Sequence, residues 1–282
     1  MITNSSSSDA GESAGGDAVQ VRKDVPSGTI IIRRPHRMNA LDLDTMNLIR
    51  DAFEDLHQER LVRAVILTGS GSAFSSGTDL YEVAEQGASR EAHDCWREAT
   101  ETYGELIETM LRFPKPIIAA VNGPALGWGA GLVLASDIVI GGSQATIGWP
   151  EARRGLVPNL SAPLLAFRVG AGLAARLLLT GEILDSEEAT RCQVFHERVD
   201  NDLVWARAME IAEQCAEGAP TSLQMTKQML NETIGESLFT FHSIGAANAA
   251  AARTTDTASE GVNAFVQKRD PDWQNPTGWP AP

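Results

Sequence analysis

The stretch of residues 117–158 constrains the fold most, because it alternates short apolar runs with glycine-rich corners. Residues 117–121 form an apolar run of the length typical of a buried strand, and the turn residues 122–124 end it. Glycines at alternate positions of 127–131 then lead into an apolar helical segment. Peptide N–H groups in the first turn of a helix have no intrahelical acceptor and attract negative charge. The sequence therefore predicts a strand, a sharp corner and a helix whose first backbone donors are free.

A second corner of the same kind lies upstream. Residues 64–68 form another apolar strand-like run, and a serine- and glycine-rich segment at 69–77 follows it before an ordered pattern resumes at 78–80. The two corners can therefore aim two backbone donors at one oxygen atom. Preorganised donors of this kind stabilise an oxyanion, and a single donor contributes about 3 to 4 kcal/mol.

Strand and helix patterns alternate through the first half of the chain. Strand-like runs begin near residues 28, 64, 117 and 137, which is typical of ββα or βαβ units whose sheet is covered by helices. Helical periodicity is found at 44–59, with Asp42 or Asp44 as the N-cap, and from Tyr103 to Leu111, whereas 84–92 is polar and aperiodic. Beyond residue 160 the helical segments are 174–179, 187–193, 202–217, 222–232 and 237–253. These patterns predict an α/β fold with a helical C-terminal third.

The domain organisation follows from the same patterns. Residues 1–19 contain a serine run and almost no large apolar side chains, so burial cannot offset the entropy of ordering them and we expect a disordered tail. The expected regions are then an α/β core at 20–200, a helical region at 201–270 and an irregular tail at 271–282 that is rich in proline.

Composition excludes several classes of function. A formal net charge of −14 disfavours binding to nucleic acid or to an anionic membrane, and no apolar run approaches the length of a membrane span. The three cysteines and five histidines show neither a disulfide framework nor metal-ligand spacing, so we expect no metal. The N-terminal segment lacks the features of a secretory signal. A reducing cytoplasm is the expected location.

Five short motifs, in order along the chain, resemble those of the crotonase (enoyl-CoA hydratase/isomerase) superfamily. They are RPHRMNAL at 34–41, FSSGTDL at 74–80, NGPALGWG at 122–129, LTGE at 179–182 and FVQKR at 265–269. The resemblance covers about residues 20–270. It implies a spiral of ββα units, a helical C-terminal region that makes trimer contacts, and a homotrimer or dimer of trimers. It also implies an acyl-CoA substrate, so that CoA enters as part of the substrate and no cofactor is bound permanently.

Position within these motifs assigns the catalytic groups that the resemblance implies. The backbone N–H groups of Thr78 and Trp128 fall where the family holds the thioester oxygen. Glu151 lies in IGWPEARRGLVP at 147–158, which resembles the family segment that carries a catalytic glutamate. Apolar neighbours would raise the pKa of such a carboxyl toward neutrality. The alternatives are that the glycines beside Trp128 only permit tight packing, and that Glu151 pairs with Arg153 or Arg154 on a solvated loop.

One departure from the family pattern narrows the set of reactions that the resemblance implies. Hydratases of this family with two glutamates place the second carboxylate where this chain has Gly131. Loss of an acid–base group slows hydration by about 10²- to 10⁴-fold, whereas one carboxylate suffices to move a proton between two carbons. Double-bond isomerisation of an enoyl-CoA is therefore the leading prediction. The alternatives are a hydratase or hydratase-lyase, a decarboxylase that forms a CoA enolate, and a noncatalytic CoA-binding scaffold. Candidates for a second acid are Tyr81, Tyr103, His93 and Glu98.

The resemblance also implies which residues contact CoA. They are Arg37, Asn39, Ala40, Leu41, Ser76, Gly77, Gly127, Phe265 and Lys268. Asp79 is expected to cap the helix that follows it. A dinucleotide site is a poor alternative, because the third glycine of its fingerprint falls on Leu132. No G-x-S-x-G motif frames any serine of residues 70–76 as a nucleophile.

Overall fold

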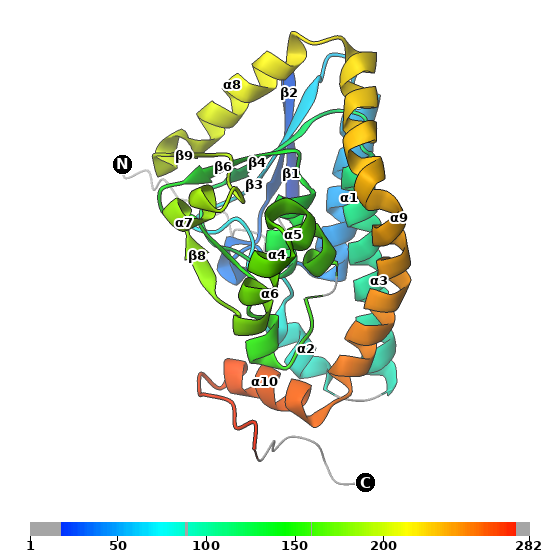
Figure 1. Cartoon of the computed structure of the whole chain (residues 1–282), viewed down its shortest axis with the longest axis vertical. Helices are drawn as coiled ribbons and strands as arrows, with labels where there is room; N and C mark the ends of the chain where they lie inside the picture. The colour runs from blue at the N-terminus through cyan, green and yellow to red at the C-terminus, as the bar shows by residue number, and fades with distance from the viewer. Residues whose placement is uncertain (1–17, 88–89, 159, 275–282) are drawn as a thin grey trace, which may run out of the picture.

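Two β-sheets form the centre of the computed structural model, which describes residues 18–87, 90–158 and 160–274 (Figure 1). The larger sheet contains, in spatial order, β1 (Val19–Asp24), β2 (Ser27–Ile32), β3 (Ala64–Gly69), β4 (Ile117–Val121), β6 (Ile138–Gly142) and β9 (Glu197–Val199). Its strands are parallel except for the antiparallel pair β1 and β2. The smaller sheet consists of β5 (Ala125–Leu126), β7 (Thr146–Gly148) and β8 (Ile183–Asp185).

Helices cover both faces of the larger sheet. They are α1 (Leu43–Gln58), α2 (Leu80–Gln86), α3 (Arg90–Arg112), α4 (Trp128–Ala135), α5 (Ser161–Val169), α6 (Ala171–Thr180), α7 (Ser186–Arg191), α8 (Val204–Ala216), α9 (Pro220–Arg253) and α10 (Asp256–Val266). Short 3₁₀ helices occur at η1 (Pro35–Arg37), η2 (Pro150–Arg154) and η3 (Asn201–Leu203). The long helices α3 and α9 lie side by side along one side of the molecule, and α10 closes one end (Figure 1).

Alternate side chains of the central strands enter two separate cores. Ile66 and Ile118 point toward α8, where they pack with Ala208, whereas Val65 and Leu67 belong to the larger core on the opposite face. Successive residues of a strand face opposite sides of its sheet, and a parallel sheet is covered on both. This is why β3 and β4 read as continuous apolar runs rather than as alternating ones.

Most of the predicted elements are confirmed. The α/β class holds, and the strands expected near residues 28, 64, 117 and 137 are β2, β3, β4 and β6. Asp42 is the N-cap of α1, since its carboxylate accepts a hydrogen bond of 2.8 Å from the Thr45 N–H. Asp79 caps α2 by accepting from the N–H groups of Tyr81 and Glu82.

Three boundaries differ from the expectation. Strand β1 begins at Val19, inside the segment expected to be a disordered tail, while residues 1–17 lie outside the described part. The polar stretch from residue 84 is split between α2 and α3. The segments 222–232 and 237–253 are one helix, α9, which packs along α3. A glycine such as Gly235 costs about 1 kcal/mol in a helix, which packing along a neighbouring helix easily offsets.

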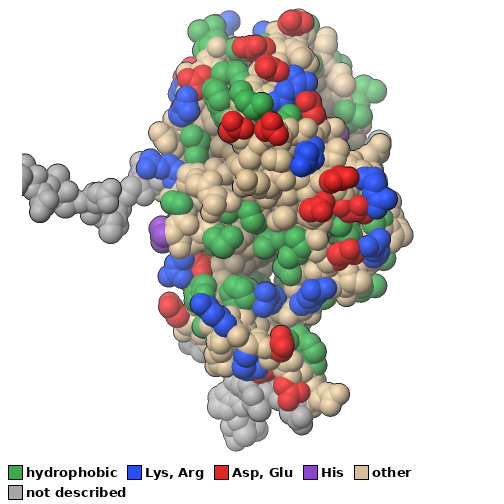
Figure 2. Space-filling view, turned by 90° about the vertical axis from the view of Figure 1, so that its left-hand side faces the viewer, with side chains coloured by type: hydrophobic (Ala, Val, Ile, Leu, Met, Phe, Trp, Pro, Cys, Tyr) green, Lys and Arg blue, Asp and Glu red, His purple; other side chains and the backbone are tan. Residues whose placement is uncertain are grey.

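Charged side chains of both signs are mixed on the surface. On the side drawn in Figure 2, Lys and Arg side chains are interspersed with Asp and Glu. Across residues 18–87, 90–158 and 160–274, no helix has the length and apolar character needed to cross a membrane.

Candidate active site

The two predicted corners meet at the carboxyl ends of β3 and β4. The N–H groups of Phe74 and Ser75 both donate to the Pro124 carbonyl at 3.1 Å, and the Leu126 N–H donates to the Ser75 carbonyl at 2.9 Å. Parallel strands bring their carboxyl ends to the same edge of a sheet, which is where sites in such folds form. The corners are therefore joined by backbone hydrogen bonds, and the Asn122 side-chain amide adds a further bond of 3.0 Å to the Gly71 carbonyl.

Glycine is required where the corners touch. Gly77 has a φ of +82°, and a Cβ atom there would lie 2.5 Å from the Leu126 carbonyl oxygen and 3.0 Å from the Trp128 nitrogen. A Cβ at Gly129 would lie 2.4 Å from the Ser75 carbonyl oxygen. Gly129 thus does permit tight packing, and the close packing also brings the peptide of Thr78 next to that of Trp128.

The peptide N–H groups of Thr78 and Trp128 have no acceptor within the described chain. Trp128 is the first residue of α4, so its N–H has no intrahelical partner. Leu41 pairs with Thr78 in an isolated parallel bridge, in which the Leu41 N–H donates to the Gly77 carbonyl. The N–H of Thr78 itself takes no part in this bond. Thr78 also lines the cavity described below. Two adjacent corners thus each present a free donor.

Glu151 supplies a buried carboxyl beside these donors. It lies on η2, where Pro150 begins the helix, and its residue is 8% exposed. Neither carboxyl oxygen has a hydrogen-bond partner within the described residues. A Cβ at Gly127 would be 3.1 Å from Glu151 Oε1, which places the carboxyl directly over the residue that precedes Trp128. Burial raises the pKa of Glu151 to about 7.

The neighbouring arginines do not pair with Glu151. Arg153 donates instead to the Thr180 carbonyl at 2.7 Å, and the Arg154 guanidinium lies over the Phe265 ring, 4.3 Å from its centroid. The alternative of a solvated ion pair is therefore wrong. With no positive partner to favour its charged form, Glu151 remains able to exchange a proton near neutral pH.

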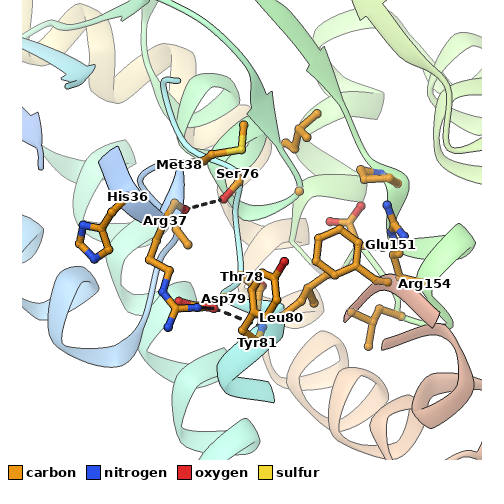
Figure 3. Close-up of a pocket in the computed structure, with 16 residues that line it drawn as sticks. His36, Arg37, Met38, Ser76, Thr78, Asp79, Leu80, Tyr81, Glu151 and Arg154 are labelled. Atoms are coloured by element: carbon orange, nitrogen blue, oxygen red, sulfur yellow. Dashed lines mark hydrogen bonds and ion pairs between the residues drawn. The ribbon is translucent and has the colours of Figure 1, made fainter. Parts of the chain in front are cut away.

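A cavity of about 540 Å³ opens onto Glu151 and Thr78. It is lined by His36, Arg37, Met38, Ala40, Ser76, Thr78, Asp79, Leu80, Tyr81, Leu126, Gly127, Pro150, Glu151, Arg154, Leu156 and Phe265. In Figure 3, Arg37 and Asp79 stand on one side of the cavity and Glu151 and Arg154 on the other, with Thr78 between them. The cavity combines an apolar wall with a small number of polar groups, as is usual for a small-molecule site.

Most of the residues predicted to contact CoA lie on this cavity, and four do not. Arg37, Ala40, Ser76, Gly127 and Phe265 line it. Asn39 is fully buried and holds its loop together, because its side-chain amide donates to the carbonyls of Ser70 and Ala73. Leu41 and Gly77 are packed behind the wall, and Lys268 is exposed beyond the end of α10.

The basic residues near position 34 are largely paired. Arg34 forms an ion pair of 2.9 Å with Asp42 and one of 3.5 Å with Asp79. Arg37 is 3.9 Å from Asp79 and lies over the Tyr81 ring, 5.5 Å from its centroid. Arg34 therefore fixes the loop that precedes α1, and Arg37 is the member of this group that faces the cavity.

The predicted candidates for a second acid occupy different places. Tyr81 lines the cavity, whereas His93 and Glu98 lie on α3 away from its wall. Tyr103 is fully buried behind the corner, and its hydroxyl donates to the Trp128 carbonyl at 3.2 Å. Trp128 itself turns its indole away from the cavity and stacks on Tyr103, with ring centroids 4.5 Å apart.

Sequence reasoning missed Arg154 as a cavity residue. A 3₁₀ helix has three residues per turn, so Arg154 lies one turn after Glu151 on the same side of η2. That spacing was the available signal, but it requires knowing that residues 150–154 are helical. Within the described residues, no group of three or more His, Cys, Asp or Glu side chains could hold a metal ion.

Comparison with known proteins identifies the class of enzyme. The family model for enoyl-CoA hydratase/isomerase matches residues 27–276. The chain therefore belongs to the enoyl-CoA hydratase/isomerase family, within the crotonase superfamily, and it is an enzyme of that family that acts on an acyl-CoA thioester.

Individual relatives carry hydratase names. A candidate enoyl-CoA hydratase of Thermus thermophilus is 36% identical over 245 residues, covering 86% of this chain and 95% of the relative. The 2,3-dehydroadipyl-CoA hydratase of Escherichia coli is 30% identical over 250 residues, with coverage of 87% and 94%. The crystal structure of carnitinyl-CoA hydratase from Mycobacterium avium superposes with a TM-score of 0.79 at 30% identity, over 92% of this chain and 99% of that one.

Proposed function

We propose that this enzyme isomerises the double bond of an enoyl-CoA, using Glu151 as its proton carrier and the N–H groups of Thr78 and Trp128 as its oxyanion site. The observation that carries the proposal is the buried Glu151 carboxyl, which has no hydrogen-bond partner among the described residues, beside two backbone N–H groups that have no acceptor there. A carboxyl with a pKa of about 7 is half ionised at neutral pH, so it can both take and return a proton.

The reaction needs no other acid–base group. The Glu151 carboxylate removes a proton from C2 of a 3-enoyl-CoA, and the released electron pair moves onto the thioester oxygen. The N–H groups of Thr78 and Trp128 stabilise the resulting dienolate oxygen. The protonated Glu151 then returns the proton to C4, so that the double bond moves from C3–C4 to C2–C3. Arg37, Ala40, Ser76 and Phe265 line the cavity where the CoA part of the substrate would bind.

Hydration is the second candidate, because relatives at 30% identity or above carry hydratase names. It requires a group that activates water at the β-carbon while another delivers a proton at the α-carbon. Gly131 provides no such group, and among the predicted substitutes only Tyr81 lines the cavity.

Incubation in ¹⁸O-enriched water separates the two reactions. Purified protein is given 3-enoyl-CoA and, separately, 2-enoyl-CoA, and the products are resolved by retention and mass. Migration of the double bond without added ¹⁸O supports isomerisation. Rapid ¹⁸O incorporation with 2-enoyl-CoA, at a rate above that of migration, would make hydration the main reaction.

We further propose a homotrimer or dimer of trimers in the cytoplasm. Met225 and Met229 lie one turn apart on α9 and are 59% and 69% exposed, so they offer an apolar contact to another copy of the chain. Cys95, Cys192 and Cys215 are all free thiols, which fits a reducing compartment. Sedimentation equilibrium tests the assembly directly, and a monomer at micromolar concentration would contradict it.

A further inference from the structure

The space beside Gly131 is already filled. A Cβ atom at Gly131 would lie 1.8 Å from the Tyr103 hydroxyl oxygen, 3.1 Å from Tyr103 Cζ and 2.9 Å from Ser161 Oγ. Real Cβ atoms do not approach other heavy atoms within 3 Å unless something shifts. Position 131 therefore accepts only glycine while residue 103 is a tyrosine in this position, and a carboxylate side chain has no room there.

Tyr103 is held in that place from several directions. It is fully buried on α3, and its ring stacks on Trp128 at 4.5 Å with an interplanar angle of 6°. Trp128 also stacks on Trp96 at 5.6 Å, and the Trp96 indole N–H donates to the Ala249 carbonyl of α9 at 3.2 Å. The stack thus runs from the first turn of α4 to α9, and Tyr103 cannot rotate away without opening the core.

The same tyrosine contacts the residue that carries a proposed oxyanion donor. Its hydroxyl donates to the Trp128 carbonyl at 3.2 Å, while its ring covers the Trp128 indole. Both contacts act on the residue whose N–H is the second proposed oxyanion donor. Oxyanion donors depend on their position to within a fraction of an ångström, so a residue that fixes Trp128 also fixes its N–H.

We propose that Tyr103 is a positioning and specificity-determining residue, which excludes a second carboxylate at position 131 and holds the Trp128 peptide in place. The expected effect of Tyr103 on the reaction rests on the proposed function. The exclusion of a side chain at position 131 does not rest on it.

Tyr103 does not replace the carboxylate as a base. Burial raises its pKa well above the ordinary range, and the charge of Glu151 acts in the same direction. The hydroxyl therefore remains protonated at neutral pH and serves as a hydrogen-bond donor. An enoyl-CoA whose reaction needs only Glu151 is accommodated, whereas one that needs a second base at position 131 is not.

The first test measures the steric coupling without any use of activity. G131A should lower the melting temperature by about 5 °C in the native background, because overpacking strains the core. In the Y103F background the closest oxygen is gone, and the same substitution should cost less than half as much. S161A is the matched control, since it removes the 2.9 Å contact at position 131 but keeps the Tyr103 hydroxyl, and it should leave most of the loss. Equal losses in the native and Y103F backgrounds would overturn the steric claim.

The second test separates positioning from simple packing. Y103F keeps the ring and its stack but removes the hydrogen bond to Trp128. We expect kcat for isomerisation to fall by about 3- to 10-fold with KM unchanged, because the donor acts mainly on the transition state. An unchanged kcat, or a rise in KM alone, would overturn the positioning role.

The third test asks whether the enzyme can be given hydratase activity. Y103A/G131E provides both the space and the carboxylate, and it should incorporate ¹⁸O into 2-enoyl-CoA at least about 10-fold faster than G131E or Y103A alone. Equal incorporation by G131E alone would show that Tyr103 excludes nothing. If the double variant does not fold, the melting-temperature coupling still decides the steric claim. Failure of the proposed function has a different signature, since the native protein would then not move the double bond of 3-enoyl-CoA while the melting-temperature coupling persisted.

Discussion

Two buried glutamates lie on neighbouring elements and have opposite surroundings. Glu151 on η2 is 8% exposed and has no hydrogen-bond partner within the described chain. Glu260 on α10 is 0% exposed, and both of its oxygens accept from the Arg269 guanidinium while one also accepts from the Asp272 N–H at 2.8 Å. The same type of side chain is therefore free to exchange a proton in one place, whereas in the other both of its oxygens are held by hydrogen bonds. We call Glu260 the anchor for this reason.

The pKa values of the two carboxyls move apart for this reason. Burial without donors raises the pKa of Glu151 to about 7, whereas the Arg269 and Asp272 hydrogen bonds lower that of Glu260 to about 2. Burial alone does not decide what a carboxyl does. The donors around it decide whether the charged form is favoured.

The anchor also supports the site. Helix α10 packs so closely on η2 that a Cβ at Gly261 would lie 2.3 Å from the Arg154 carbonyl oxygen. Phe265, on the same helix as Glu260, lines the cavity and lies under Arg154. The structural glutamate therefore holds one wall of the cavity that the other glutamate faces.

The largest expected effect is the loss of turnover in E151Q. The substitution preserves size and burial but removes the group that carries the proton, so kcat should fall by about 10²- to 10⁴-fold. Steady-state kinetics with 3-enoyl-CoA measure the loss, and E182Q is a matched control on an exposed glutamate that is ion-paired with Arg176. Unchanged turnover in E151Q would contradict the role of Glu151 as the proton carrier.

The next effect concerns stability and pH. The folded-state pKa of Glu151 is about 7 against an ordinary value of 4.5, so the unfolded chain ionises this group first. The free energy of unfolding should therefore fall as pH rises from 4.5 to 7, by about 3 kcal/mol for this group. The measurement is the difference between the native protein and E151Q in urea unfolding across that range. If the difference in the free energy of unfolding did not depend on pH, the pKa of Glu151 would not be raised in the folded protein.

The smallest expected effect concerns the other glutamate, Glu260. The Glu260 carboxylate stabilises the fold above pH 4.5, and this contribution is lost as pH falls toward its folded pKa of about 2. R269A removes its main donor, so the variant should melt about 5 °C lower at pH 7, and this difference from the native protein should shrink on acidification, because the native protein then loses the contribution of Glu260. Thermal scans from pH 3 to 7 measure this. R112A, on an exposed arginine of α3, should show neither change, and an R269A profile that matches it would contradict the anchor role.

Parts of the fold and site followed from local patterns. The strands at 64 and 117 were predictable because both faces of a parallel sheet are buried, which makes their sequences continuous apolar runs. Asp42 and Asp79 were predictable as helix caps because capping depends on neighbouring peptide groups. The short strands β5, β7, β8 and β9 were not, since two or three residues carry no periodicity.

Other features required residues that are distant in the chain. Asn39 was predicted to contact CoA, and its side-chain amide donates to the carbonyls of Ser70 and Ala73, which are 31 and 34 residues further along the chain. The isolation of Glu151 depends on Arg153 and Arg154 having partners at Thr180 and Phe265. No local pattern predicts such partners, because residues that are distant in the chain come within contact distance of a side chain only when the chain folds.

The sequence by itself determined the α/β class, the glycine corners with their free N–H groups, and the absence of a carboxylate at Gly131, since each depends on local backbone geometry or on residue identity. Only the tertiary structure decided that Glu151 has no hydrogen-bond partner in the described part of the chain and that Tyr103 fills the space beside Gly131. Both are matters of close packing between η2, α3 and α4, and packing at the scale of one atom depends on the positions of all three elements at once.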